Sequence, residues 1–582
     1  MKPNSHHANL TGRQTKIVTD PYFPRYLTAG PGTGKTEVLI CKVAHLVRNM
    51  PDNYKAKFAV ITYTNKATDE MRNRLNDKLD GKRMDILEVS TIHSFCYKLL
   101  RKYGSAIGFS PGFSIKSYEN EVAWAASDAV WQANEPLTKQ IPIRKLRHII
   151  NGALKECYTH GIVPSMDYIK PNKQDDALWT ELEAAIMRIC IAAHSELELK
   201  KRQDDAMTLN DLITMTRELL EDEQIAKRIA SEYEYVFIDE FQDTNASQLD
   251  IVRLLINVGV KVFLIGDEKQ SIYAFRGADI ECSRQAKELM ASYHSLDDFE
   301  INENFRTDQA LITEINAVFS RPFIYKNRQL SFLQAPLVKT DELQRAPAAN
   351  SEPFRIKHGE GISAIVTGLL EESLHGHKIK HEDIYILCRT NGGVRQVRSK
   401  LMQNGITCAE AGHVEEDELS EYLENDLDAK LGYTKARKGV NVLTIHKAKG
   451  LSLPVVIVPN IDRNLIRKRA ETGYLIDRNA KIFALANVTD RITASQKYLK
   501  LQKEKTILRL EEELRILYVA MTRAEHVLIL ACPASKEEIR HAPKDKNKTT
   551  WNDLIGENSR DSKLQRLYKD IIGIRFFNGR RK

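Results

Sequence analysis

Short apolar runs alternate with longer amphipathic stretches along most of the chain. The segment "YLTAGPGTGKTEVLICKVAHLV", which begins at Tyr26, opens with an apolar run, passes a glycine-rich turn and continues with helical spacing. The segment "FAVITYTNKATDEMRNRL" repeats this order, with Met71 and Leu75 on one helical face. Strands that alternate with helices predict an α/β fold built on parallel sheets.

The apolar runs fall into two groups, which predict two sheets. The first half contains "YVFI" and "KVFLIG", and the second half contains "IYILCRTN", "VNVLTIHKAKG", "PVVIVPNI" and "HVLILACP". A long stretch in the first half, residues 101–204, reads as a helical insertion. Ligands of parallel sheets bind at the carboxyl ends of the strands, so the polar residues that follow these runs are the candidates for a site.

Composition narrows the class of protein. The 582 residues are too many for one core and predict several domains. No apolar run is long enough for a membrane span, and the N-terminus lacks the apolar core of a signal peptide. Eight scattered cysteines without metal-ligand spacing predict reduced thiols in the cytoplasm and no structural zinc. The net charge of +8 is compatible with a polyanionic partner but does not require one.

The glycine-rich turn "AGPGTGKT", residues 29–36, fits a phosphate-binding loop between a strand and a helix. Its glycines let backbone N–H groups surround phosphate oxygens, Lys35 adds a positive charge, and Thr36 offers a hydroxyl to Mg²⁺. A chance glycine loop is the simpler reading, but the strand–turn–helix context disfavours it. The nucleotide-binding candidates here are Gly30, Gly32, Thr33, Gly34, Lys35 and Thr36.

A carboxylate pair follows the apolar run "YVFI". Adjacent carboxylates are usually solvated surface groups, but Asp239 and Glu240 come directly after four apolar residues and so are expected at a strand end inside a cleft. Asp239 can share the Mg²⁺ shell with Thr36, and Glu240 can orient or deprotonate an attacking water.

The loop "GDEKQSIYAFRGAD", residues 266–279, carries an amide, two aromatic rings and an arginine after a buried strand. Tyr273 and Phe275 are spaced by two, so on their own they fit one face of a core strand. The rest of the chain changes this interpretation.

The polar segments occur in the order of one known family. They are "NLTGRQ", "AGPGTGKT", "TYTNKATDEM", "STIHSF", "IDEFQDTN", "GDEKQSIYAFRGAD", "INENFRT", "VLTIHKAKGL" and "LYVAMTRAE". With these motifs, most of residues 5–535 resemble the superfamily 1 DNA helicases of the UvrD/Rep/PcrA type. The resemblance implies two RecA-like P-loop domains with parallel sheets, ATP and Mg²⁺ as cofactors, and 3′→5′ movement on single-stranded or tailed duplex DNA.

The resemblance also implies roles for single residues. Gln14 would read the adenine edge, and Phe305 would stack on adenine. Gln270, Arg306 and Arg523 would contact the γ-phosphate, joining Lys35, Asp239 and Glu240 as catalytic residues. In this reading the aromatic residues of the opening loop stack on bases rather than pack in a core. The DNA-binding candidates are Tyr63, Asn65, Thr91, His93, Tyr273, Phe275, Thr444 and His446.

Two positions depart from the family pattern. Glu37 stands where the family has an arginine that packs on adenine, so the grip on the nucleobase is expected to differ. Ser452 stands where the family has a glutamate that contacts the ribose, which puts discrimination between ATP and dATP in question.

The second insertion of the family is short here, which favours translocation over unwinding and resembles the compact helicase-like subunit of antiphage systems such as Gabija. That resemblance implies a nuclease partner. The alternative function is a regulatory subunit that senses ATP and DNA for such a nuclease in defence or repair; an RNA-directed ATPase is a weaker alternative. The expected boundaries are 1–100 and 205–295 for the first RecA-like domain, 101–204 for its helical insertion, 296–390 and 436–535 for the second domain, 391–435 for the reduced second insertion, and 536–582 for a basic C-terminal extension.

Overall fold

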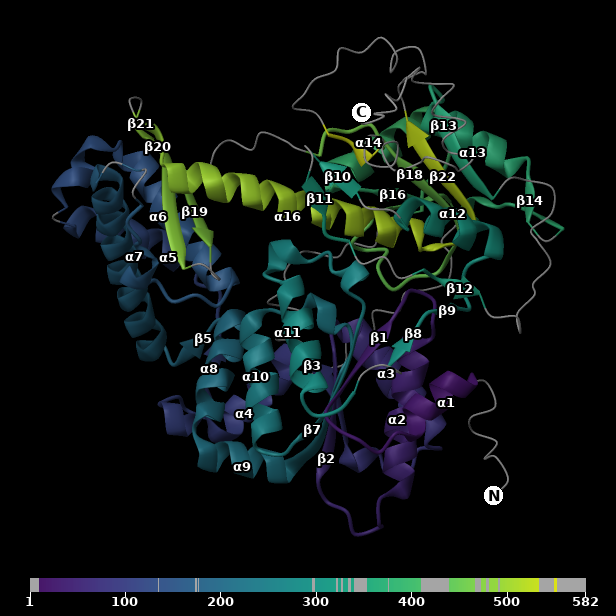
Figure 1. Ribbon diagram of the computed structural model, residues 1–582, viewed down its shortest axis with the longest axis horizontal. Helices are drawn as coiled ribbons and strands as arrows, with labels where there is room; N and C mark the ends of the chain where they lie inside the picture. The colour runs from purple at the N-terminus through teal and green to yellow at the C-terminus, as the bar shows by residue number, and fades with distance from the viewer. Residues whose placement is uncertain are drawn as a thin grey trace, which may run out of the picture.

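The protein is described by a computed structural model (Figure 1). The residues that it describes are 10–133, 135–172, 175, 177–295, 299–320, 323–325, 328–332, 336–339, 353–374, 376–409, 439–465, 473–477, 481–489, 492–532 and 549–551.

Six parallel strands form the first sheet, and the sequence predicted that this sheet is parallel. Their order is β3 (Leu87–Thr91), β2 (Lys57–Thr62), β6 (Tyr233–Ile238), β7 (Lys261–Gly266), β1 (Arg25–Ala29) and β8 (Glu300–Ile301). The edge strand β8 lies beyond the predicted end of this domain at residue 295. It pairs with β1 through Thr28 and Ala29, so the chain leaves the first sheet later than the sequence indicated.

Helices cover both faces of the first sheet. One face packs against α1 (Gly12–Thr19), α2 (Lys35–Asn49) and α3 (Asn65–Lys78). The other face packs against α4 (Ile92–Tyr103), α8 (Leu209–Glu221), α9 (Glu223–Glu232), α10 (Ala246–Asn257) and α11 (Ile280–Ala291). Burial on both faces explains why these strands read as continuous apolar runs.

Five parallel strands form the second sheet. Their order is β13 (Phe354–His358), β22 (Ala524–Cys532), β18 (Leu453–Pro459), β16 (Ile384–Cys388) and β17 (Asn441–Thr444). Helices α12 (Gln309–Phe319) and α16 (Gln496–Met521) cover one face, and α13 (Ile362–Leu370) and α14 (Asn391–Gln403) cover the other. The predicted architecture of two parallel α/β domains is therefore confirmed.

Helix α14 occupies the start of the predicted second insertion at 391–435. Its Val397 and Leu401 are buried in the core of the second sheet, so this helix is part of the second domain. The remainder of that insertion, from residue 410, lies outside the described residues. Most of the predicted C-terminal extension also lies outside them, but Trp551 is buried and donates its indole N–H to the Glu513 carbonyl at 3.1 Å.

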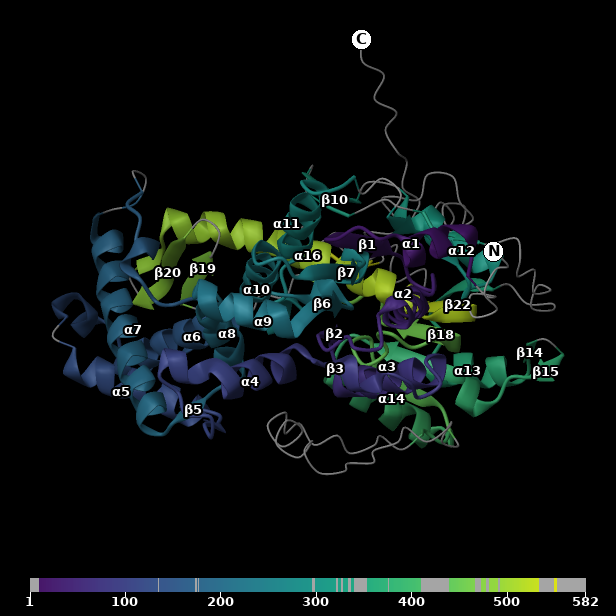
Figure 2. The ribbon, with the colours of Figure 1, turned by 90° about the horizontal axis from the view of Figure 1, so that it is seen from below.

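The helical insertion consists of α5 (Glu119–Gln132), α6 (Ile143–Thr159) and α7 (Ala177–Gln203). A small antiparallel sheet of β19 (Tyr474–Asp477), β20 (Ile482–Thr489) and β21 (Ile492–Ala494) lies beside these helices, far along the chain (Figures 1 and 2). Its strands β19 and β20 contribute buried side chains to the core of the insertion. We call α5–α7 together with β19–β21 the outer module.

Helix α16 connects the outer module to the second sheet (Figure 1). Its first turn contacts the insertion, while its C-terminal half lies in the core of the second domain. The shorter strand pairs are β4 (Ser114–Ile115) with β5 (Ala206–Met207), β9 (Glu303–Asn304) with β12 (Val338–Lys339), β10 (Phe323–Tyr325) with β11 (Arg328–Leu330), and β14 (Ser373–Leu374) with β15 (His377–Lys378). Among the described helices, none has the length and apolar character that crossing a bilayer requires.

Candidate active site

The glycine-rich loop joins the end of β1 to the first turn of α2. Gly32 and Gly34 both have left-handed backbone, with φ of 71° and 73°, which a side chain would strain. A Cβ atom at Gly32 would also lie 2.8 Å from Cβ of Arg306, so the loop needs glycine there for close approach. Thr33 closes the turn by donating its hydroxyl to the Gly30 carbonyl at 2.8 Å. Lys35 and Thr36 then begin α2, where backbone N–H groups point outward.

Two predicted nucleobase contacts border this loop. Gln14 is buried in α1 and donates its side-chain N–H to the Thr33 carbonyl at 3.0 Å. Its position follows from a capping box, in which Thr11 and Gln14 exchange hydrogen bonds at the start of α1. The backbone N–H of Phe305 donates to the Gly32 carbonyl at 2.8 Å. The structure thus brings Gln14 and Phe305 to adjacent carbonyls of one loop.

The carboxylate pair lies at the end of β6, beside the loop. Lys35 forms an ion pair with Glu240, and the Asp239 backbone N–H donates to the Ile61 carbonyl at 2.9 Å. Burial raises the pKa of Asp239 to about 6. Burial alone would also raise the pKa of Glu240, but the ammonium groups of Lys35 and Lys449 lower it to about 2. The two neighbouring carboxylates therefore differ in their affinity for protons.

The donor groups suit a magnesium ion that is shared with a nucleotide. Thr36 offers a hydroxyl and Asp239 a buried carboxylate, which are the oxygen ligands that Mg²⁺ prefers. Within the described part of the chain, no group of three or more acidic, histidine or cysteine side chains forms a cage of its own. Phosphate and water oxygens would therefore have to complete the shell, as is usual for Mg²⁺ in nucleotide sites.

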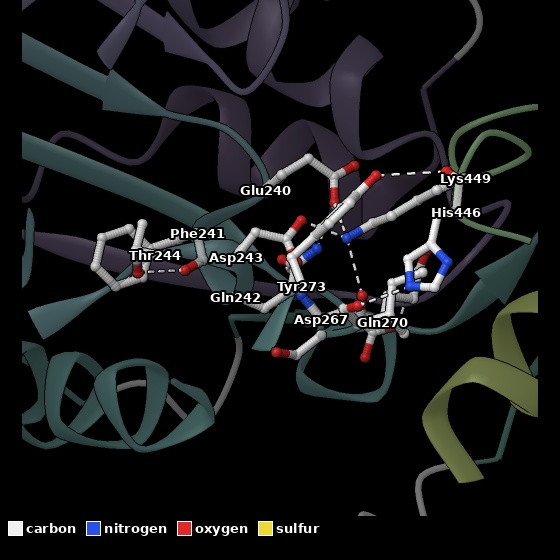
Figure 3. A network of polar contacts seen from close by, with 12 residues as sticks. Glu240, Phe241, Gln242, Asp243, Thr244, Asp267, Gln270, Tyr273, His446 and Lys449 are labelled. Atoms are coloured by element: carbon white, nitrogen blue, oxygen red, sulfur yellow. Dashed lines mark hydrogen bonds and ion pairs between the residues drawn. The ribbon is translucent and has the colours of Figure 1, made fainter. Parts of the chain in front are cut away.

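Gln270 is the centre of a polar network at the end of β7 (Figure 3). Its side-chain N–H donates to Asp267 at 2.8 Å, and its side-chain oxygen accepts from Arg523 at 3.4 Å. Gln242 continues the network, because it donates to Glu240 and accepts from the Asp267 backbone N–H at 2.9 Å. The chain of contacts runs from the carboxylate pair to the arginine of the second domain.

Both predicted arginines lie at this junction. Burial and the neighbouring Arg306 lower the pKa of Arg523 to about 9, so the two guanidinium groups are close enough to repel each other. Arg306 keeps one buried nitrogen, Nη1, without a hydrogen-bond partner. A buried and unpaired donor is costly, and an anionic ligand would satisfy it and relieve the repulsion. The pair therefore fits a phosphate group.

Lys449 is a functional candidate that was not predicted from the sequence. It enters from the turn after β17 in the second domain, forms an ion pair with Asp243, and donates to the Gln270 carbonyl at 2.8 Å (Figure 3). Its ammonium also lies 3.8 Å from Glu240 and 5.1 Å from the centre of the Tyr273 ring. The signal available in the sequence was its place in "HKAKGL", beside the named His446.

The aromatic candidates form one cluster between the domains, which we call the stacking cluster: Tyr63, Tyr273, Phe275 and His446. Tyr63 and Tyr273 stack with ring centres 5.1 Å apart, and Phe275 meets His446 edge-on at 5.2 Å. Phe275 is 61% exposed, so this ring does not pack in a core as its spacing alone would have allowed. Tyr273 is partly buried against the second domain. Arg276, which was not predicted, lies over the rings of Tyr273 and Phe275 at 5.6 and 5.8 Å.

The polar DNA-binding candidates have local partners. The Thr91 hydroxyl caps α4 by accepting from the Ser94 backbone N–H at 3.2 Å, and the Thr444 hydroxyl accepts from the Lys447 backbone N–H at 3.3 Å. Burial lowers the pKa of both His93 and His446 to about 4, so both rings are neutral at pH 7. Asn65 begins α3 next to Tyr63. Their contact with DNA stays a prediction.

The departure at Glu37 has a structural counterpart. Its carboxylate binds Arg74 at 2.6 Å and Lys78 at 2.9 Å, so a glutamate in α2 holds two cations of α3. Burial raises the pKa of Glu37, but these cations outweigh it and lower the pKa below its usual value. The side chain therefore serves helix packing in this structure.

Comparisons with known proteins agree with this geometry. Residues 10–291 match the UvrD/REP helicase N-terminal domain, and residues 412–534 match the UvrD-like helicase C-terminal domain. The chain is 26% identical to the ATP-dependent DNA helicase PcrA of Leuconostoc citreum over 68% of its own length and 48% of that relative. It is 27% identical to the ATP-dependent DNA helicase Rep of Escherichia coli (strain K12), over 66% and 52% of the two chains.

A third relative is the ATP-dependent DNA helicase UvrD1 of Mycobacterium tuberculosis, 28% identical over 70% of this chain and 50% of the relative. The chain spans about half the length of the curated relatives that it matches. Because both matched domains come from one family and carry the two halves of the site, the chain belongs to the UvrD/Rep family of superfamily 1 helicases.

Proposed function

We propose that this protein hydrolyses ATP between its two α/β domains and uses the energy to move 3′→5′ along single-stranded DNA. One observation carries the proposal. The loop that follows β7 places Gln270 against Arg523, and three residues later it places Tyr273 on Tyr63. A single short segment thus joins the phosphate side of the site to an aromatic surface.

The residues around the loop divide the chemistry between them. The loop N–H groups and Lys35 bind phosphate oxygens, and Thr36 with Asp239 would hold Mg²⁺, which neutralises charge on those oxygens. Glu240 accepts the proton of the attacking water. Lys35 lowers the pKa of Glu240 in the observed pair, so Glu240 becomes a stronger base when Lys35 turns to phosphate.

Arg306 and Arg523 stabilise the negative charge that develops on the transferred phosphoryl group. Arg306 lies two residues after β9, next to Phe305, whose N–H binds the glycine-rich loop. Arg523 immediately precedes β22 of the second domain. Binding of a γ-phosphate between them favours a closed arrangement of the domains, and hydrolysis removes that preference.

The stacking cluster supports DNA as the polymer that moves. Aromatic rings bind bases without regard to sequence, and each stacked base contributes about 1–3 kcal/mol. Arg276 adds a positive charge beside the two rings of the loop. The 3′→5′ direction rests on the family resemblance, and the UvrD/Rep relatives are themselves named ATP-dependent DNA helicases.

The decisive experiment measures ATPase rate and strand displacement on 3′-tailed, 5′-tailed, blunt and single-stranded DNA. We expect single-stranded DNA to stimulate hydrolysis and only the 3′-tailed duplex to be unwound. Lys35→Ala should abolish hydrolysis, because it removes the phosphate-binding charge. Hydrolysis that ignores DNA, or that survives in Lys35→Ala, would contradict the proposal.

A second candidate is a regulatory subunit that senses ATP and DNA for a nuclease. Helix α14 belongs to the second domain, and this favours the second candidate. Only residues 410–438 then remain in the sequence for a second insertion. Stimulated hydrolysis without strand displacement, together with a copurifying nuclease, would support this candidate over a self-sufficient motor.

A further inference from the structure

One carboxylate on the nucleotide-facing side of the second domain has no assigned role. Glu525 is the only position of β22 that is not buried. The Ser452 hydroxyl donates to its Oε1 at 2.5 Å, and its Oε2 lies 3.7 Å from His526 Nε2, too far for a hydrogen bond. One oxygen is therefore fixed, and the other is available for a donor.

The backbone places this carboxylate beside the nucleotide loop. The Asp308 N–H donates to the Glu525 carbonyl at 2.9 Å, and the Thr307 hydroxyl donates to the Ala524 carbonyl at 3.0 Å. The same segment begins at Phe305, whose N–H binds the Gly32 carbonyl at 2.8 Å. Glu525 thus shares one continuous border of the site with the residue proposed to stack on the nucleobase.

The electrostatic effect of Glu525 on Arg306 also locates its carboxylate. Among the surrounding charged groups, Glu525 acts most strongly on the Arg306 guanidinium, ahead of Glu240. Arg306 is the proposed phosphate contact and Phe305 the proposed base contact, and the backbone of Glu525 is bonded to Asp308 in the same short segment. Between a base and its phosphates a nucleotide has only its sugar, so the donors within reach of Glu525 are ribose hydroxyls.

We propose that Glu525 binds the ribose of the nucleotide and selects ATP over dATP, with Ser452 as its positioning residue. A carboxylate is an acceptor without a proton of its own, and acidic side chains bind ribose 2′-hydroxyls in other nucleotide sites. The inference rests on the proposed function, since it concerns the same nucleotide. It also gives Ser452 a role: the hydroxyl orients a carboxylate that reaches the site from the neighbouring strand.

Calorimetric titration with Mg–ATP and Mg–dATP tests this without requiring turnover. We expect the wild-type protein to bind ATP about tenfold more tightly than dATP, the usual worth of a hydrogen bond to a charged group. Glu525→Ala should weaken ATP binding to the level of dATP and leave dATP binding unchanged. Ser452→Ala should reduce the preference in part, because the carboxylate stays but loses its orientation.

A rescue variant separates selection from general damage. In Glu525→Ala, the added change Ser452→Glu puts a carboxylate back at the neighbouring position and should restore part of the preference. Equal loss for both nucleotides in Glu525→Ala would mean that Glu525 only supports Arg306, and would overturn the inference. Equal wild-type binding of both nucleotides would also overturn it while leaving ATP hydrolysis intact, whereas no binding of either would contradict the proposed function as well.

Discussion

Within the described part of the chain, two of the places where its halves meet differ in kind. The cleft contains charged contacts beside the aromatic stacking cluster: Lys449 reaches Asp243, and Arg523 reaches Gln270. In the outer module the contacts are mostly apolar: buried side chains of β19 and β20 complete the core of α5–α7. Both places join residues several hundred positions apart, but charged hydrogen bonds are prominent only at the cleft.

The difference shows which contact can respond to a ligand. A charged hydrogen bond at the cleft can be exchanged for one to a phosphate or a base with little net change in free energy. Apolar area in the outer module has no such substitute, because separation would return it to water at about 25 cal/mol per Å². We therefore infer that the outer module stays assembled while the cleft opens and closes.

Lys497 offers the sharpest test of the outer module. It forms a buried ion pair with Glu183 of α7, and Asp175 caps the start of α16 beside it. At about pH 8, above the pKa of about 7 that burial gives Glu183, Lys497→Met should lower the free energy of unfolding by about 3–5 kcal/mol, because it leaves a buried, ionised carboxylate without its partner. Urea unfolding, with hydrogen exchange in α5–α7, measures the loss.

The matched control is Lys505→Met, about two turns further along α16. Lys505 pairs with Glu156 at 2.7 Å but is partly exposed, so its loss should cost less than about 1 kcal/mol. If the two variants were equally stable, the outer module would not depend on its buried pair. Adding Glu183→Leu to Lys497→Met should recover most of the stability, since it removes the unpaired charge.

Lys449→Met tests the cleft. We expect DNA-stimulated ATP hydrolysis to fall about 100-fold, or about 3 kcal/mol in the activation barrier, because the cation between Asp243, Glu240 and Tyr273 is gone. The pair of Lys449 with Asp243 is as buried as that of Lys497 with Glu183, so the unfolding midpoint should fall as well, and the rates are compared at a temperature where both proteins are folded. Lys447→Met, an exposed lysine two positions earlier, is the control and should keep normal rates. If Lys449→Met lost stability but kept its normal rate of hydrolysis, the cleft contact would be structural and would not respond to the ligand.

The smallest expected effect is a pH dependence in the outer module. Burial raises the pKa of Glu183 to about 7 against a usual 4.5, and its Oε1 has no hydrogen-bond partner. The folded state then holds a proton that the unfolded state releases, so stability falls as pH rises from about 4.5 to 7. Between pH 5 and 7 the fall should be about 2 kcal/mol. Glu183→Gln should flatten this slope in urea unfolding; an unchanged slope would assign it to other groups.

Much of the fold was accessible from the sequence because burial on both faces makes a strand distinctive. The runs that became β6, β7, β16, β18 and β22 were all predicted. The edge strand β8 was assigned to the wrong side of the domain boundary, because an edge strand is short and its apolar side chains do not reveal which sheet they join.

The site was predictable to the extent that its residues occur in short motifs. The glycine-rich loop and its strand neighbours specify Lys35 and Glu240 locally, and the structure pairs these side chains. Lys449 was missed because a lysine in a turn is usually a solvated residue, and only the fold shows the carboxylates that it faces. The packing of β19 and β20 against the insertion was missed for a similar reason. Apolar residues in a strand show that one face is buried, but they do not show which other element covers it.

Helix α16 has a mechanical consequence. It is one unbroken helix of 26 residues, about 39 Å long, with its last turn directly before Arg523 and its first turn held by the outer module. In a helix of this length, a rotation of about 5° about the arginine end would displace the far end by roughly 3 Å, so a small change in the angle of the second domain at the nucleotide would reach the helical insertion as a larger movement.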